Sequence, residues 1–449
     1  MENIIFKRKI YTQLLQWKEE DSGSTAVLIK GPRRVGKSTI AEQFAKNEYK
    51  SYILIDFGKA NKDVRRLFDD VSDLDYLFNN LQVMFRTQLT PRKSAIIFDE
   101  VQRCPNARQA IKYLVQDGRY DYIETGSLIS IRKNVSDIII PSEEVPVEMH
   151  PLDYEEFRWA LGDFATMPLL KAALKDKKPL SDAVNRQMMR DFRLYMLVGG
   201  MPQAVATYLT TKSLAKVDRV KRNIINLYES DFMKIDPSGN ASAIFKHIPS
   251  ELTSNSSRYQ VTRATIEGRA SALSETIFEM KESLVVNIAY HANDPSVGLP
   301  LHQDTNRYKI FLCDTGLFVT LAFWDKKFTD NTIYQKLLSD KLSADLGYVY
   351  ENVVAQMLKA GGYELFYYTF PTESEKHNYE IDFILSDGAK ITPIEVKSSG
   401  YKTHVSLDEF CKKFSSRIKN RLLIYTKDLK RDGETSYIPA YMTPLLSEL

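Results

Sequence analysis

The chain has 449 residues, 43% hydrophobic and 27% charged, a balance typical of a soluble globular protein with two or three domains rather than a disordered one. The net charge of +3 is too small to argue for or against nucleic-acid binding. Its three cysteines lack metal-ligand spacing, so we expect reduced thiols. We see no signal-peptide segment and no apolar run of ~18 residues, which favours a cytoplasmic protein without a membrane partner.

The first motif lies in TAVLIKGPRRVGKSTI, residues 25–40, where an apolar strand at 26–29 precedes a loop and a helical pattern. The loop has the phosphate-loop spacing G-x-x-x-x-G-K-S in its required context. Its backbone amides and the helix N-terminus suit phosphate oxygens, Lys37 would reach the β- and γ-phosphates, and the Ser38 hydroxyl would bind Mg²⁺. The predicted ATP-binding residues are Gly31, Arg33, Arg34, Val35, Gly36, Lys37, Ser38 and Thr39.

Two further strands bring polar residues towards this loop. SAIIFDEVQ ends a buried strand with Asp99, expected in the Mg²⁺ shell, and Glu100, expected to polarise the attacking water. A helix N-cap is the alternative for this acidic pair. After the strand at 120–124, Thr125 and Ser127 are equally plausible contacts for the γ-phosphate or the water, and a plain turn is the alternative for both. With a strand at 52–57, the first 150 residues predict a parallel α/β sheet.

Residues 151–235 show helical periodicity and predict a helical lid, which Gly199-Gly200-Met201-Pro202 interrupts as a turn or hinge. Residues 241–315 then suggest a winged helix, with three helices and two wing strands. Its third helix could bind DNA, with arginines near its entry, or the domain could simply pack against its neighbours. Either Arg103 or Arg132 could serve as an arginine finger between subunits, and the sequence does not choose.

The stretch EIDFILSDGAKITPIEVKSSG, residues 380–400, predicts a hairpin that carries charges among apolar residues. A four-residue loop places Asp382 opposite Glu395, whereas a two-residue loop places Glu380 there. Facing carboxylates repel unless a cation such as Mg²⁺ compensates them. Lys397 lies two residues after Glu395, on the same face of the strand, and could activate a metal-held water. The alternative is a solvated hairpin face on which Lys397 pairs with Glu395.

Several motifs together resemble a prokaryotic AAA-superfamily ATPase with a C-terminal uncharacterised domain of nuclease-like core. They are GPRRVGKST, IIFDEVQ, ETGS, HPLDYEEF, VGGMPQAV, KIFLCDTGLF and GYVYENVVAQML, and they span almost the whole chain. An acid followed by acid-x-lysine on the next strand resembles the restriction-endonuclease-like core. That resemblance implies that Asp382 and Glu395 hold a metal, that Glu351 adds a helical acid, and that Lys397 acts on the water. Domains of this fold also persist as binding or assembly modules.

We therefore expect an α/β protein in four parts: a P-loop ATPase core at 1–150, a helical lid at 151–238, a winged helix at 239–335 and a restriction-endonuclease-like domain at 336–449. The predicted function is Mg²⁺-dependent ATP hydrolysis coupled to action on DNA. That action could extend to DNA cleavage by Asp382, Glu395 and Lys397. The alternative is a nucleotide-controlled switch or DNA-binding regulator whose nuclease-like domain cuts nothing. A homo-oligomer is also expected from the resemblance to ring-forming ATPases.

Overall fold

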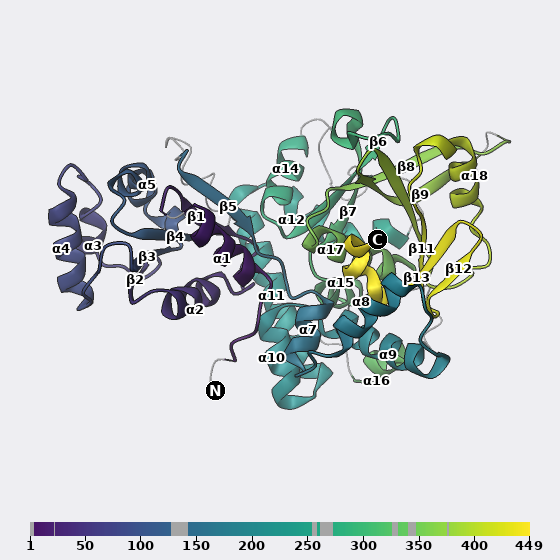
Figure 1. The fold of residues 1–449 in the computed structure, drawn as a ribbon, viewed down its shortest axis with the longest axis horizontal. Coiled ribbons are helices and arrows are strands. Elements are labelled where there is room, and N and C mark those ends of the chain that lie inside the picture. The colour runs from purple at the N-terminus through teal and green to yellow at the C-terminus, as the bar shows by residue number, and fades with distance from the viewer. Residues whose placement is uncertain are drawn as a thin grey trace. The chain divides into compact units, whose positions relative to one another are not determined.

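The computed structural model describes residues 4–21, 23–126, 142–253, 258–260, 273–325, 331–339, 347–374 and 377–449. The chain forms two compact units (Figure 1). The first comprises Met1–His150 with Glu282–Leu284, and the second comprises Pro151–Lys281 with Val285–Leu449. The boundary expected after residue 150 coincides with this division, whereas the boundaries expected at 238 and 335 fall within the second unit.

The first unit is an α/β domain around five parallel strands in the order β2-β3-β4-β1-β5. Its elements are α1 Ile10–Glu20, β1 Ala26–Lys30, α2 Lys37–Glu48, β2 Ser51–Asp56, α3 Lys62–Arg66, α4 Leu74–Phe85, β3 Ser94–Asp99, η1 Val101–Arg103, α5 Pro105–Asp117, β4 Asp121–Gly126 and β5 Glu144–Glu148. The parallel P-loop sheet expected from the sequence is confirmed. Because all five strands run the same way, their carboxyl ends share one edge of the sheet.

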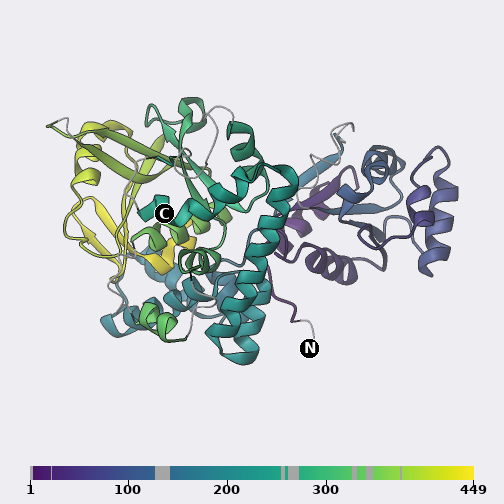
Figure 2. The same ribbon diagram turned by 180° about the vertical axis from the view of Figure 1, so that it is seen from behind.

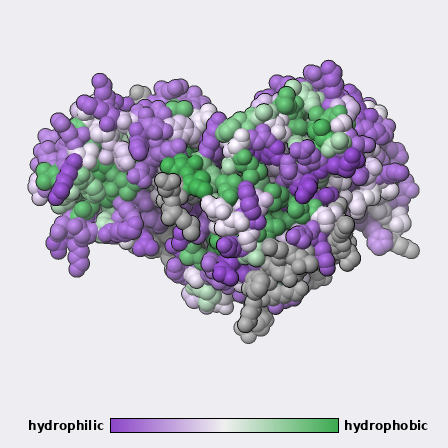
Figure 3. All heavy atoms as spheres, turned by 90° about the horizontal axis from the view of Figure 1, so that it is seen from below, coloured by the Kyte–Doolittle hydropathy of each residue, from purple (hydrophilic) through white to green (hydrophobic). Residues whose placement is uncertain are grey.

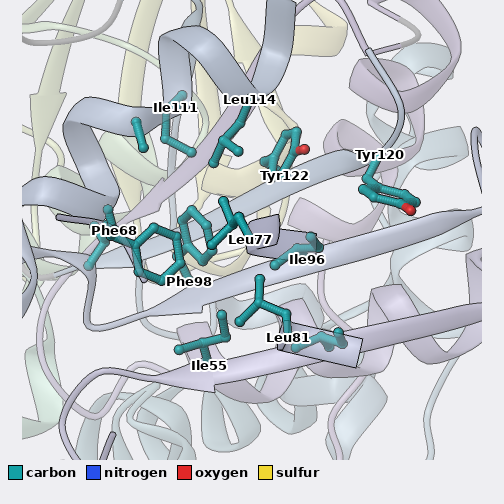
Figure 4. Packing of buried hydrophobic residues seen from close by; sticks show 14 of the residues in the cluster. Ile55, Phe68, Leu77, Leu81, Ile96, Phe98, Ile111, Leu114, Tyr120 and Tyr122 are labelled. Carbon is teal, nitrogen blue, oxygen red and sulfur yellow. The ribbon is translucent and has the colours of Figure 1, made fainter. Parts of the chain in front are cut away.

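Alternating apolar residues fill both faces of this sheet. On one face, strand residues such as Ile55, Ile96 and Phe98 pack against Leu77 and Leu81 of α4 (Figure 4). Phe98 also meets Phe68 edge to face, with ring centroids 5.4 Å apart. On the other face, α1 and α2 cover the strands with a second apolar cluster. Burial on both faces explains the near-continuous apolar runs of the strands, which made them recognisable in the sequence.

The second unit combines many helices with an eight-stranded sheet of order β12-β13-β11-β10-β9-β8-β6-β7 (Figure 2). Its helices are α7 Tyr154–Ala160, α8 Thr166–Asp176, α9 Asp182–Val198, α10 Pro202–Thr211, α11 Leu214–Ile235, α12 Asn240–Thr253, α14 Ser274–Glu282, η3 Leu299–His302, α15 Thr315–Ala322, α16 Asn331–Leu338, α17 Gly347–Ala360, α18 Val405–Lys413, η4 Ser415–Arg417 and η5 Ala440–Glu448. Its strands are β6 Val286–Ala292, β7 Gln303–Leu312, β8 Leu365–Pro371, β9 Asn378–Asp387, β10 Lys390–Val396, β11 Arg421–Tyr425, β12 Lys430–Asp432 and β13 Thr435–Pro439.

The two strands expected as the wing of a separate winged helix are β6 and β7. They pair with each other antiparallel, but β6 also pairs in parallel with β8, so both strands belong to the C-terminal sheet. The free edge of a two-stranded wing carries unpaired backbone groups, and here β8 satisfies those of β6. Most of the helix expected to read DNA is α14, whereas Ser271 at its start and Arg263 and Arg269 near its entry lie outside the described residues.

The eight-stranded sheet is covered on both faces. Helix α18 supplies Leu407, Phe410 and Cys411 to an apolar cluster on one face. Helix α17 lies against β6, β7, β8 and β10 on the other face. Outside these cores the surface is mostly hydrophilic, with smaller apolar patches, on the face that Figure 3 shows.

The turn at Gly199-Gly200 is a close-packed junction within the second unit. The Gly200 amide donates to Asp314 Oδ2 at 2.5 Å, and the Asp314 carboxylate is fully buried. A Cβ added at Gly316 would lie 2.6 Å from the Gly199 Cα, so the two backbones require glycine at this contact. Lys221 donates to the Leu197 and Gly316 carbonyls at 2.6 and 3.0 Å. The glycines at this turn therefore serve close packing.

Candidate functional site

The phosphate loop joins the end of β1 to the start of α2 at Lys37. Two loop residues have positive φ, Gly36 at 103° and Arg34 at 67°. Gly31 is required for packing, because a Cβ there would lie 2.3 Å from the Met149 carbonyl oxygen. Arg8 donates to the carbonyl oxygens of Val35 and His150, at 3.0 and 2.5 Å. Arg8 thus fixes the loop from outside the motif, a role that no spacing rule signalled.

Lys37 lies inside the loop rather than in solvent. Its side chain is buried, and Nζ donates to the Gly31 and Pro32 carbonyls, each at 2.9 Å. Burial lowers the pKa of Lys37 to about 8, although the carboxylates of Glu100 and Asp99 oppose this shift. A buried ammonium held by neutral carbonyls is poised to exchange them for phosphate oxygens, which would stabilise its charged form.

Three predicted residues from separate motifs meet at the carboxyl edge of the sheet. Ser38 Oγ donates to Asp99 Oδ1 at 2.6 Å, and Thr125 Oγ1 donates to the same oxygen. Asp99 ends β3 and Thr125 lies at the end of the neighbouring β4, so strand order alone brings them together. These hydroxyl and carboxylate oxygens are the donors that Mg²⁺ takes beside a bound nucleotide. Their chemistry therefore fits the expected Mg²⁺.

Glu100 follows Asp99 in a left-handed backbone conformation with φ 55°. Such a position is costly for a residue other than glycine and is found where geometry serves function. Its amide donates to Thr125 Oγ1 at 3.3 Å, and its carboxylate accepts from Gln102 Nε2 at 2.6 Å. Glu100 is thus held beside the Ser38–Asp99–Thr125 group, as expected for a residue that would orient a water.

The remaining predicted loop residues differ in exposure. Val35 is buried, Arg33 is half-buried, and Arg34 and Thr39 are exposed at the start of α2. Ser127, the alternative to Thr125, lies outside the described residues, as does Arg132. The other candidate finger, Arg103, is exposed in η1.

Three charged residues with buried side chains, on α5, β4 and β5, were missed in the sequence. Arg108 of α5 donates to Glu144 Oε1 at 3.0 Å, and Glu124 of β4 is fully buried. Burial raises the pKa of Glu124 well above its usual range, and the nearby Glu144 raises it further. The sequence did signal Glu124, since it is an acid within an apolar strand. Its charged neighbours Arg108 and Glu144 lie 16 or more positions away, so the sequence could not identify them.

The acidic residues of the second unit lie around strands β9 and β10. The hairpin pairs Lys390 with Asp387 and continues to Ile394 with Phe383, the register that brings Asp382 opposite Glu395. Asp382 Oδ2 accepts from the Val396 amide at 2.7 Å.

Two lysines compensate these acids. Lys397 Nζ lies 2.8 Å from Glu395 Oε1. Lys309 of β7, which the sequence analysis missed, pairs with Glu380 and lies 3.9 Å from Glu351 Oε2. Burial raises the pKa of Asp382 well above its usual range, with Glu351 adding to the shift and Lys309 opposing it.

We call Glu351, Glu380, Asp382, Glu395, Lys309 and Lys397 the acidic cluster. Within the described parts of the chain, no three acidic, histidine or cysteine side chains are arranged to hold a metal ion. The Lys309 ammonium instead lies among the carboxylates. Lys309 lies on a strand 71 positions before Glu380 in the chain, so no local motif could indicate that the two residues pair.

Three family models match parts of the chain. Residues 23–158 match the model of an AAA domain, which together with the loop geometry supports a P-loop domain of AAA type in this part of the chain. Residues 189–327 match a domain of unknown function, DUF8612, and residues 346–442 match another, DUF4143. The search of curated proteins returned no match to the chain.

Solved structures give only distant likenesses. The Walker-type ATPase of Pyrococcus abyssi is 16% identical, with a TM-score of 0.43, covering 71% of this chain and 96% of its own. Cdc6p from Pyrobaculum aerophilum is 12% identical, with a TM-score of 0.26, covering 76% and 97%. At these scores, the assignment rests on the family match and the loop geometry. No helix among the described residues has the length and apolarity needed to span a bilayer.

Proposed function

We propose that the chain is an Mg²⁺-dependent ATPase whose nucleotide cycle drives action on nucleic acid. The observation that carries the ATPase proposal is the convergence of Ser38, Asp99 and Thr125 beside the buried Lys37. Three motifs, with residues up to 88 positions apart, supply the parts of one phosphate site, which chance does not explain.

Each residue has a distinct role in this proposal. Lys37 releases the loop carbonyls and binds the β- and γ-phosphates. Ser38 and Asp99 hold the Mg²⁺, which neutralises charge on the phosphate oxygens when bound. Glu100 orients and polarises the attacking water, and Thr125 contacts the γ-phosphate or that water. The Gln102 amide, 2.6 Å from the Glu100 carboxylate, holds this base in place before nucleotide arrives.

Steady-state ATP turnover tests these roles. Glu100→Gln should keep nucleotide binding but lower turnover by about a hundredfold or more, since general-base groups contribute roughly 10²–10⁴-fold. Lys46→Ala, which removes an exposed lysine from the same helix as Lys37, is the matched control and should leave turnover unchanged. Wild-type turnover in Glu100→Gln would contradict the assignment of the base.

For the acidic cluster, we favour a binding or assembly role without cleavage. The supporting observation is Lys309, a protein cation already lying beside Glu351 and Glu380. It compensates charge that an Mg²⁺ would otherwise neutralise, and its own pKa is raised by these carboxylates, so it stays charged at neutral pH.

DNA cleavage is the second candidate, and one observation favours it. Glu395 Oε2 is buried and has no hydrogen-bond partner among the described residues, an arrangement that a metal ligand would explain. Plasmid DNA incubated with ATP and either Mg²⁺ or Mn²⁺ distinguishes the two readings. Cutting that Asp382→Ala abolishes, while ATP turnover persists, would establish the nuclease. Intact plasmid under both metals would support the binding or assembly role.

A further inference from the structure

A basic groove lies along helix α9 in the second unit. Its lining residues belong neither to the phosphate loop nor to the acidic cluster. It has a volume of about 690 Å³ and is bounded by α9, α16 and the segment after β11. Its lining residues are Asn185, Arg186, Met189, Arg190, Arg193, Gln335, Leu338, Ser339, Thr426 and Lys427. Asn185 connects two of its walls, because its side-chain amide donates to the Thr426 carbonyl at 3.4 Å and accepts from the Tyr441 hydroxyl at 3.0 Å.

The charged side chains among the described lining residues are all cationic. Arg186, Arg190 and Arg193 stand at i, i+4 and i+7 and therefore share one face of α9. Lys427 adds a fourth cation from the opposite wall. Arg186, Arg190 and Lys427 are exposed, whereas Arg193 is half-buried and its Nε donates to the Tyr350 hydroxyl at 3.4 Å. No carboxylate is among the described residues that line this groove.

We propose that this groove binds the phosphodiester backbone of nucleic acid. The rise of an α-helix is about 1.5 Å per residue, so the arginine row from 186 to 193 spans roughly 10 Å. Each strand of B-DNA rises about 3.4 Å per nucleotide along the duplex axis, so this row spans the rise of about three nucleotides. Planar guanidinium groups bind phosphate oxygens in pairs, which favours arginine over lysine at such sites.

The shape of the groove favours an extended chain over a single small anion. Of its apolar residues, Leu338 is half-buried and can contact sugars or base faces while the arginines hold phosphates, whereas Met189 is buried. A free triphosphate would use the cations but leave this apolar surface uncovered. The inference rests on the proposed action on nucleic acid and locates it on a surface that the sequence analysis did not identify.

Fluorescence anisotropy of the full-length chain tests the groove. The probes are a labelled 20-nucleotide single strand and the same sequence as a duplex, titrated between 50 and 300 mM NaCl. The double variant Arg186→Ala/Arg190→Ala should weaken binding at least about tenfold and lower the salt slope by roughly 1.4 for single strands. Lys427→Ala should lower the slope by about 0.7.

The matched control is Lys216→Ala/Arg219→Ala, which removes two exposed cations from α11 outside the groove. It should bind the probes like the wild type. Thermal melting and ATP binding, measured on every variant, confirm that each is folded. Inorganic triphosphate is the competitor: it should displace the oligonucleotide only at far higher concentration, and equal potency would mean a small-anion site, which overturns the proposal.

The outcomes separate the groove from the function on which it rests. If the wild type binds nucleic acid and the arginine variant binds equally well, the groove is not the site, while action on nucleic acid stands. If the control loses as much affinity as the arginine variant, the attraction is nonspecific and the groove inference also fails. If the wild type binds neither probe at 50 mM NaCl, both the groove and the action on nucleic acid are refuted.

Discussion

Replacing Lys309 with methionine tests how the acidic cluster is held together. The Lys309 side chain is 7% exposed, and it lies 3.9 Å from the Glu351 carboxylate in addition to pairing with Glu380. At an effective dielectric constant of 20, one unit charge pair at that distance is worth roughly 4 kcal/mol before desolvation. Removing one partner of a buried pair leaves the other uncompensated, so we expect a loss of about 3 kcal/mol. Methionine keeps much of the volume of the lysine side chain, so the substitution mainly removes the charge.

Urea unfolding followed by tryptophan fluorescence measures this loss. The chain has three tryptophans, and replacing Trp17 with phenylalanine leaves Trp159 and Trp324, both in the second unit. In that background, Lys309→Met should shift the midpoint to lower urea without changing the slope. Adding Glu380→Gln should restore part of the loss, because the carboxylate no longer needs a cation. Lys359→Met, at an ion pair with the exposed Glu364, is the control and should cost under about 1 kcal/mol.

Two results would refute this reasoning. A loss below about 1 kcal/mol in Lys309→Met would mean that the carboxylates do not depend on the lysine. A full loss that Mg²⁺ or Mn²⁺ leaves unchanged, together with no recovery from Glu380→Gln, would mean that packing rather than charge explains the effect. Recovery by a divalent metal alone would show that the site accepts a metal once the ammonium is gone, and would strengthen the cleavage candidate.

Three further predictions concern single residues. Lys37 has a pKa of about 8 without nucleotide, and phosphates stabilise its charged form, so ATP binding should take up about three quarters of a proton at pH 8.5 and almost none at pH 6.5. Calorimetry in buffers of different ionisation enthalpy measures the proton uptake. Equal uptake at the two pH values would contradict the prediction. Thr125→Val loses the hydrogen bond to Asp99, worth about 1.5–3 kcal/mol, so kcat should fall roughly tenfold to a hundredfold with KM little changed. Gly316→Ala overlaps backbone atoms at 2.6 Å and should lower stability by about 3 kcal/mol in urea, whereas Gly361→Ala, with its nearest atom at 3.3 Å, should cost far less.

Local sequence rules are enough to find the residues that meet at the phosphate loop. The loop spacing identifies Gly31 to Ser38, and parallel strand order brings Asp99 and Thr125 to the same edge. Those rules need only short-range patterns of apolar strands followed by polar residues. Arg8 was missed because its contacts are to backbone carbonyls, which leave no trace in residue type.

Long-range pairing was harder to predict from the sequence. The acids at 382 and 395 could be placed by one hairpin, but Lys309 pairs with Glu380 and Glu351 only because β7 joins β6, and β6 pairs with β8. The same pairing drew the expected wing strands into the C-terminal sheet. No periodicity in one strand specifies which distant strand will satisfy its free edge, so the cation of the acidic cluster could not be read from the chain.

Binding of Mg·ATP to the purified full-length chain, measured by isothermal titration calorimetry, tests the central claim most directly. We predict one site per chain in the wild type, retained in Lys46→Ala and lost in Lys37→Ala, since only Lys37 lies within the loop. Heat of binding that persists unchanged in Lys37→Ala, or a wild-type chain that binds no adenine nucleotide with any divalent ion, would contradict it.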